Sequence, residues 1–426
     1  MKEKLTVIPA MYYVIAALCY VATLFTDAMR PGLAGAALMA LVFAYLAFSK
    51  SIRFTCIADV IMAALFLYQV ISVVWLRAGG YPMSVYTGEF VSSTLPMIFY
   101  YAGRNCRGAD KGRWYAFFAV SVMMLGILGI VLYATAPQFY CDWAYRWSYI
   151  SKADAATLRV RMHSVVGSTC LSFLGVAGIL AGAYFLASFE DTDGEPAPAV
   201  SVPGVLRRRA IAVLIMVICL LTAIMANQRS GLVAAGLAIV FINWLVFFRL
   251  DIIPRKYFIY EVVAVVVIFA AIFAVKIEFI LKYWYRIISL PTAISQRSEQ
   301  WVAAVNNMYS SWIGNGLGAN GHRAIGFEDA HVIADGGLVK MYCENGVLGF
   351  SLFVYLMYLA LSDGVKNIRY HYAEVGIIAV GLMQSIGSNM LAFQICAPVF
   401  WFAVGACICL KRESKDSCGK FPQHPV

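Results

Sequence analysis

The stretch YAFFAVSVMMLGILGIVLYATA, residues 115–136, contains neither a charged side chain nor a proline. A membrane-spanning helix needs about 20 mainly apolar residues, so this stretch predicts a helix that crosses a lipid bilayer. Across the whole chain, 62% of the residues are hydrophobic and 13% are charged, and the mean hydropathy is +0.76. Soluble globular proteins have about 25% charged residues, so the composition excludes that class.

Comparable apolar windows recur along the chain and predict an all-α polytopic membrane protein with about twelve spans. They lie at residues 8–26, 32–49, 57–76, 85–102, 115–136, 163–189, 210–227, 231–248, 257–275, 337–361, 373–389 and 392–410. The window at 85–102 is the weakest, because it includes Glu89 and Pro96. We expect a single membrane domain over residues 1–426, with a first outer loop at 137–162, a cytoplasmic linker at 190–209 and a large outer loop with short helices at 276–336.

The positions of the lysines and arginines predict the orientation. Most of the 33 basic residues fall in alternate loops together with both ends of the chain. Because cytoplasmic loops are enriched in Lys and Arg, we expect both termini to be cytoplasmic. These loops account for most of the net charge of +10, so no nucleic-acid partner is expected.

Several arginines nevertheless fall on the predicted outer side. Arg229 lies in NQRSGL between two windows, and is either an interfacial residue whose guanidinium reaches water or an anion-binding group held at membrane depth by a tight helical hairpin. Arg297, in SQRSEQW, is either a solvated loop residue or faces inward together with Arg229.

Four further outer arginines are weaker candidates for binding an anion. Arg286 and Arg323 are either lipid head-group contacts or loop charges, and Arg159 and Arg161 would share a face on a strand but diverge on a helix. A guanidinium matches phosphate in shape and stays charged, so a lipid diphosphate is the obvious ligand on this side. If the diphosphate is also a leaving group, the arginines would stabilise the charge that develops on it. A protein that binds or transports the lipid would use the same residues.

The stretch AHVIADGGLVKMYCENGVLGF, residues 330–350, places ionisable groups at the start of an apolar window. His331 and Asp335 would share one face of a helix. Asp335 is either a helix cap or a general base that takes a proton from a sugar hydroxyl. Glu344 either lies on a similar face or pairs with Lys340 at i,i+4. Since His, Asp and Glu do not cluster at metal-ligand spacing, neither a metal nor another cofactor is expected.

These motifs together resemble those of the Wzy-type O-antigen and capsular polysaccharide polymerases and the related O-antigen ligases. The resemblance covers roughly residues 220–360. It consists, in order, of NQRSGL between two spans, QRSEQW near the start of a long outer loop, GNGLGANG within it, and ADGGLVKMYCENGVLGF leading into a span.

The resemblance implies a metal-independent membrane glycosyltransferase of the GT-C type in the bacterial inner membrane. Such enzymes act on the periplasmic side on undecaprenyl-diphosphate-linked sugars. The functional arginines of the family fall on Arg229 and Arg297. In ligases, the segment that corresponds to DGGLVKMYCENG begins with a histidine and leads to an acidic residue. Glu344 matches the acidic residue, and Asp335 stands at the position of the histidine. This departure favours a polymerase, and it leaves the acid/base residue open between Asp335 and His331.

We therefore expect a polymerase that transfers the growing glycan onto the non-reducing-end sugar of a new lipid-linked repeat unit. Its expected partners are the lipid-linked donor and acceptor glycans and membrane lipids, with a chain-length regulator protein as a further candidate. One alternative is a ligase that transfers the glycan to lipid A core. Another is a flippase or other transporter, which should place its charges along a cavity within the spans.

Overall fold

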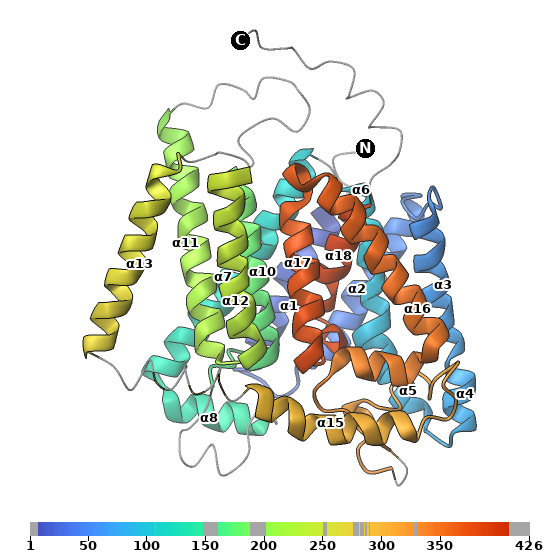
Figure 1. Ribbon diagram of the computed structural model, residues 1–426. Coiled ribbons are helices and arrows are strands. Elements are labelled where there is room, and N and C mark those ends of the chain that lie inside the picture. The colour runs from blue at the N-terminus through green and yellow to red at the C-terminus, as the bar shows by residue number, and fades with distance from the viewer. Residues whose placement is uncertain are drawn as a thin grey trace.

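The structure, a computed structural model, describes residues 7–106, 108–147, 161–187, 202–249, 254–275, 281, 285, 288, 290–327 and 330–408. Every element in these ranges is a helix, which confirms the all-α prediction for this part of the chain. Most helices stand side by side, while α8 and α15 lie across one end of the bundle (Figure 1).

The N-terminal half contains long helices and one stretch of short ones. Its elements are α1 (Val7–Ala22), α2 (Pro31–Phe48), α3 (Ile57–Ile71), α4 (Val73–Ala78), α5 (Met83–Glu89), η2 (Phe90–Thr94), η3 (Leu95–Ile98), α6 (Phe99–Asn105), α7 (Gly108–Thr135), α8 (Pro137–Arg146) and α10 (Ser168–Ala187). Helix α8 lies within the predicted first outer loop, where burial of its Cys141 raises the pKa of that thiol.

The C-terminal half contains the hairpin and the large loop that the sequence singled out. Its elements are α11 (Val202–Ala226), α12 (Arg229–Asn243), η4 (Trp244–Arg249), α13 (Lys256–Val275), α15 (Leu290–Asn306), η5 (His322–Ala324), α16 (Gly337–Lys366), α17 (Ile368–Gly387), η6 (Met390–Ala392) and α18 (Ala397–Cys407). Among its described residues, the predicted large loop at 276–336 contains α15, of 17 residues, and the 3-10 turn η5.

Seven helices among the described residues are long and apolar enough to cross a membrane, and each overlaps a predicted window. They are Pro31–Phe48, Ile57–Ala78, Asp110–Thr135, Ser168–Leu186, Arg207–Ala226, Arg229–Arg249 and Gly337–Lys366. Two shorter apolar helices, Ile8–Ala22 and Ala397–Cys407, fall in the first and last predicted windows. This set of helices is compatible with a membrane protein.

The weakest predicted window, 85–102, does not form one continuous helix. It divides into α5, the π-helical η2, the 3-10 η3 and α6. Pro96 occupies the first turn of η3, where its missing N–H is tolerated, and the π turn before it adjusts the backbone register. Glu89 ends α5 at the start of this irregular stretch, so its side chain projects from a break in the helix.

Close helix packing in the core depends on small residues. Among the candidate spans α10 is the most enclosed, with 83% of its apolar window buried. Helices α6 and α18 approach so closely that a Cβ at Gly103 would overlap the carbonyl oxygen of Phe402, and a Cβ at Gly405 that of Tyr100. Such contacts are typical of helices that associate within a membrane.

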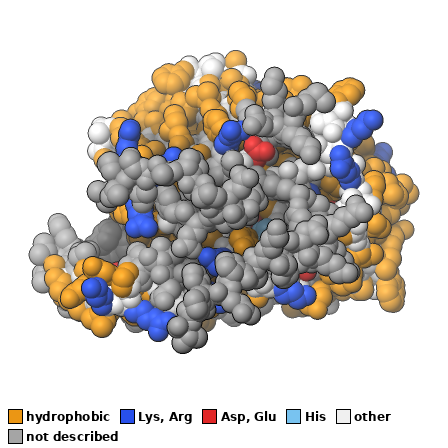
Figure 2. All heavy atoms as spheres, turned by 90° about the horizontal axis from the view of Figure 1, so that it is seen from above, with side chains coloured by type: hydrophobic (Ala, Val, Ile, Leu, Met, Phe, Trp, Pro, Cys, Tyr) orange, Lys and Arg blue, Asp and Glu red, His pale blue; other side chains and the backbone are white. Residues whose placement is uncertain are grey.

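Basic side chains are spread over the end of the bundle at which α6 and α18 end (Figure 2). The guanidinium Nη1 of Arg104, in the last turn of α6, donates to the carbonyl of Ile408 just beyond α18 at 2.6 Å, which ties the two helices together there. The exposed basic residues near this end include Arg113, Arg255, Lys256, Lys366 and Arg369.

Candidate active site

Arg297 and Asp335 form an ion pair at the end of the bundle that carries α15. Arg297 Nη2 lies 2.6 Å from Asp335 Oδ2, and Nη1 donates to the carbonyl of Gly387 at 3.3 Å. The Arg297 side chain is 27% exposed and that of Asp335 is 41% exposed. An ion pair this accessible contributes only about 0–1 kcal/mol to stability. A ligand can therefore reach both charges, and their pairing does little to hold the fold.

The backbone around Asp335 is held by two neighbouring side chains. The indole Nε1 of Trp301 donates to the Asp335 carbonyl at 2.7 Å. Asn389 Nδ2 donates to the carbonyls of Ile333 at 2.8 Å and Ala334 at 3.0 Å. Gly336 has a φ of 132°, and a Cβ there would lie 2.5 Å from Trp301 Nε1. The loop can pack this closely on Trp301 only because position 336 is a glycine.

This loop is not helical, so the expectation that His331 and Asp335 share a helix face is wrong. Helix α16 begins at Gly337, and its N-cap is Gly336, which has no side chain to cap it. Asp335 is therefore not the helix cap, and its carboxylate pairs with Arg297 instead. The carbonyl of His331 accepts a hydrogen bond from Asn320 Nδ2 at 2.8 Å.

Arg229 begins α12 at the tight turn after α11. Asn227 adopts a φ of 49°, a conformation that Asn tolerates, and Gln228 Nε2 donates to Ser168 Oγ of α10 at 2.8 Å. The Nε of Arg229 is buried and has no hydrogen-bond partner within the part of the chain that the structure describes. A buried donor in this state is costly unless a ligand or water supplies an acceptor.

The start of α12 and Arg297 meet at Gly387, the last residue of α17. A Cβ built on Gly387 would lie 3.7 Å from Arg297 Nη1 and 3.9 Å from the Cβ of Ser230, which follows Arg229. The structure thus brings the first turn of α12, α15, the end of α17 and the Asp335 loop together. We call Arg229, Arg297 and Asp335 the outer site.

The other predicted arginines are distributed differently. Arg161 precedes Met162, whose N–H donates to the carbonyl of Met225 near the end of α11 at 3.2 Å, four residues before Arg229. Arg323 lies against α5 and η2, where its Nη2 is 3.5 Å from Ser92 Oγ. Arg159 and Arg286 lie outside the described residues.

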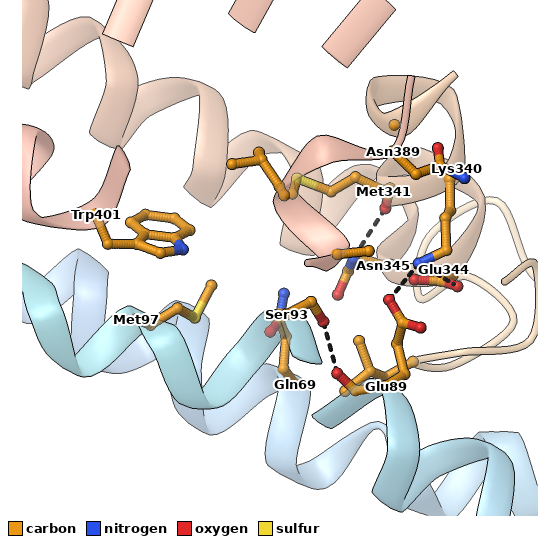
Figure 3. A pocket seen from close by; sticks show the side chains of 14 residues that line it. Gln69, Glu89, Ser93, Met97, Lys340, Met341, Glu344, Asn345, Asn389 and Trp401 are labelled. Carbon is orange, nitrogen blue, oxygen red and sulfur yellow. Dashed lines mark hydrogen bonds and ion pairs between the residues drawn. The ribbon is translucent and has the colours of Figure 1, made fainter. Parts of the chain in front are cut away.

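A second cluster of charges is buried beside α16, in a cavity shown in Figure 3. Lys340 Nζ lies 2.5 Å from Glu89 Oε1 and 3.2 Å from Glu344 Oε1, and all three side chains are at most 7% exposed. The i,i+4 pair that the sequence suggested for Glu344 is therefore present. Glu344 lies in this interior cluster, which we call the buried triad, and not in the outer site.

The cavity beside the buried triad is small and is lined by both polar and apolar side chains. Its volume is about 30 Å³, enough for one or two water molecules, and its lining includes Gln69, Asn345 and Asn389. The Oδ1 atoms of Asn345 and Asn389 are buried without a hydrogen-bond partner among the described residues. Ordered water would satisfy these acceptors. Asn389 also supports the Asp335 loop, so it connects the cavity with the outer site.

The glycine-rich segment GNGLGANG covers the buried triad from outside. Glycines 314, 316 and 318 have positive φ values, and the N–H of Gly316 donates to the carbonyl of Glu344 at 2.9 Å. That carbonyl is free for this bond because α16 is interrupted at Gly346, whose φ is 61°. The segment can pack against the α16 backbone at this break because glycines 314, 316 and 318 have no Cβ atoms.

The pairing of Glu89 with Lys340 was missed by the sequence analysis. Glu89 counted only as a weakness of its window, although a charged residue within a span usually has an opposite partner in another span. The presence of one acidic and one basic residue in two different predicted spans would have suggested that Glu89 pairs with Lys340.

The comparisons with known proteins provide no assignment. The sequence matches no protein-family model, and no curated protein is significantly similar to it. Within the described ranges, no three His, Cys, Asp or Glu side chains are arranged to hold a metal ion. The chemistry offered by the outer site is that of guanidinium groups beside one accessible carboxylate, which suits an anionic group and a hydroxyl that must lose a proton.

Proposed function

We propose that this protein is a membrane glycosyltransferase that polymerises glycan repeat units carried on a polyprenyl diphosphate. The observation that carries the proposal is the Arg297–Asp335 ion pair, 2.6 Å long and accessible, next to the helix that begins with Arg229. Support also comes from the four motifs that resemble those of Wzy-type polymerases, because three of them supply the residues of this site.

The proposed reaction moves a glycan from its diphosphate to a hydroxyl. The diphosphate of the donor binds Arg297 and Arg229, and competition for Arg297 frees the carboxylate of Asp335. That carboxylate takes the proton of the acceptor hydroxyl, whose oxygen bonds to the anomeric carbon. The bond from this carbon to the diphosphate oxygen breaks, and its electron pair leaves with the diphosphate, where the arginines stabilise the charge.

The proposed topology has twelve membrane crossings, with both termini in the cytoplasm and the outer site on the periplasmic side of a bacterial inner membrane. Exposed basic side chains lie at the end of the bundle opposite α15 (Figures 1 and 2) and support this orientation, since cytoplasmic ends are enriched in Lys and Arg. The GT-C architecture is likewise part of the proposal.

A transporter of lipid-linked glycans is the second candidate, and the buried triad is the observation that favours it. Transport proteins place ionisable groups inside their spans. The cavity beside the triad, at about 30 Å³, is however too small for a sugar. A ligase remains the alternative within the enzyme class, because it would need the same diphosphate site.

One assay separates the three functions. Purified protein in detergent, given a synthetic lipid-linked repeat unit alone, is expected to produce a ladder of longer glycans on an electrophoretic gel. A ligase would yield product only after addition of lipid A core. A transporter would yield no lengthened glycan. Reconstituted in liposomes, it would instead move a fluorescently labelled lipid-linked unit across the membrane.

A further inference from the structure

An apolar groove opens on the lateral surface between α12 and α17. Its volume is about 410 Å³, within the range of about 300–1,000 Å³ that is usual for small-molecule sites. The residues that form it include Leu237 and Val240 on α12, Trp244 at the start of η4, Ala379 and Met383 on α17, and Leu180 of α10 at its floor. The side chains of Leu237, Val240 and Trp244 are 45–66% exposed, so the groove is open toward the surrounding membrane.

Small residues keep this groove open. Ala238, Gly376 and Ala379 stand where larger side chains would fill the space between the helices. A Cβ at Gly376 would lie 2.7 Å from Leu180 Cδ2, so a larger residue there would displace the floor.

On α17 the groove ends about one helical turn from the outer site. Ala379, Met383 and Gly387 are spaced four residues apart, so they form one stripe along the helix. Gly387 accepts the hydrogen bond from Arg297 Nη1. Four residues rise about 6 Å along a helix, so Arg297 contacts α17 about one turn beyond Met383.

On α12 the groove residues also lie on the side of the helix that carries an outer-site residue, Arg229. Arg229 precedes Leu237 by eight residues, about 12 Å along the helix axis. At about 100° per residue, Val240 and Trp244 lie only about 20° and 60° around the helix from Arg229. Both helices that form the walls of the groove therefore lead from it toward an arginine of the outer site.

We propose that this groove holds the polyprenyl chain of the lipid diphosphate whose head group binds at Arg297 and Arg229. The identity of the lipid rests on the proposed function. A molecule with a dianionic head and a long apolar chain matches a surface with two arginines at one end and a lateral apolar groove. A phospholipid would match the groove alone, and a second copy of this chain would bury it without using the arginines.

Photo-crosslinking locates the chain. The full-length protein, in nanodiscs of phosphatidylethanolamine and phosphatidylglycerol, is exposed to undecaprenyl diphosphate with a diazirine in its first isoprenoid units. Crosslinked peptides are expected from residues 237–244 and 376–383. Excess unlabelled undecaprenyl diphosphate, or the Arg297→Ala substitution, should reduce this labelling at least about tenfold.

A pair of matched variants tests the groove itself. Ala379→Phe fills the groove, whereas Ala37→Phe adds the same ring to an exposed position on α2. We expect Ala379→Phe to weaken binding of undecaprenyl diphosphate at least tenfold while leaving binding of geranyl diphosphate, which is too short to follow the groove, within twofold of wild type. Ala37→Phe should change neither affinity.

Two results would overturn the proposal. One is groove labelling that persists in Arg297→Ala and resists competition by diphosphate, which would indicate ordinary membrane lipid. The other is equal loss of affinity for long and short diphosphates in Ala379→Phe. These experiments measure binding and not activity. If the protein preferred the longer diphosphate but did not lengthen glycan, the proposed polymerase would be refuted and the groove assignment would not.

Discussion

Replacing Lys340 with methionine isolates the energetic role of the buried triad. Lys340 is the cation between Glu89 and Glu344, at 2.5 Å and 3.2 Å, with all three side chains at most 7% exposed. Methionine has a similar length but no charge, so two buried carboxylates would remain close together without their ammonium. Breaking a buried ion pair by removing one partner costs about 3–5 kcal/mol. At about 2 °C per kcal/mol, this lowers Tm by about 6–10 °C.

Thermal unfolding of the purified protein in mild detergent, followed by tryptophan fluorescence, measures this change. Lys366→Met is the matched control, because Lys366 is exposed at the other end of the same helix. Adding Glu89→Gln to Lys340→Met removes one of the stranded carboxylates, so the double variant should regain part of the lost stability. A Tm for Lys340→Met within 2 °C of the Lys366→Met value would refute the account of the triad as a buried ion cluster.

Three further predictions concern the outer site and its support. Asp335→Asn should abolish glycan lengthening in the purified system while His331→Gln retains it; the reverse result would move the base to His331. Trp301→Phe loses the hydrogen bond to the Asp335 carbonyl, worth about 0.5–1.5 kcal/mol, and should slow lengthening about 2–10-fold while lowering Tm by no more than about 3 °C. A larger drop in Tm without a change in rate would make Trp301 purely structural. Gly346→Ala places a Cβ on a residue with a φ of 61°, against the Trp312 carbonyl, and should cost at least about 1–3 kcal/mol in thermal unfolding; a wild-type Tm would show that α16 is not held in this break.

The sequence predicted most of the helices because apolar windows of span length have few alternatives in a chain this hydrophobic. Motifs and their order also singled out Arg229, Arg297 and Asp335, whose segments the structure brings together. The sequence could not give the break at Gly346 or the irregular stretch from Glu89 to Ile98, because both depend on contacts between segments far apart in the chain. Glu89 and Lys340, for example, are 251 positions apart.

The Asp335 loop shows a different limit. Four-residue spacing places His331 and Asp335 on one face only if the segment is helical, and Gly336 delays the helix until the next residue. The ion pair of Asp335 with Arg297 depends on where α15 lies, which periodicity does not specify. The groove between α12 and α17 likewise depends on the relative placement of two helices.

Glycan lengthening by Arg297→Ala is the most direct test of the central claim. Arg146→Ala is its control, because Arg146 also forms an exposed ion pair with an aspartate, Asp27, at 3.0 Å. Both variants should fold normally, since such pairs contribute only about 0–1 kcal/mol. With purified proteins and a synthetic lipid-linked repeat unit, we expect Arg297→Ala to lengthen glycan about 10²–10³-fold more slowly than wild type and Arg146→Ala to match wild type. Equal rates for all three proteins would contradict the assignment of the outer site.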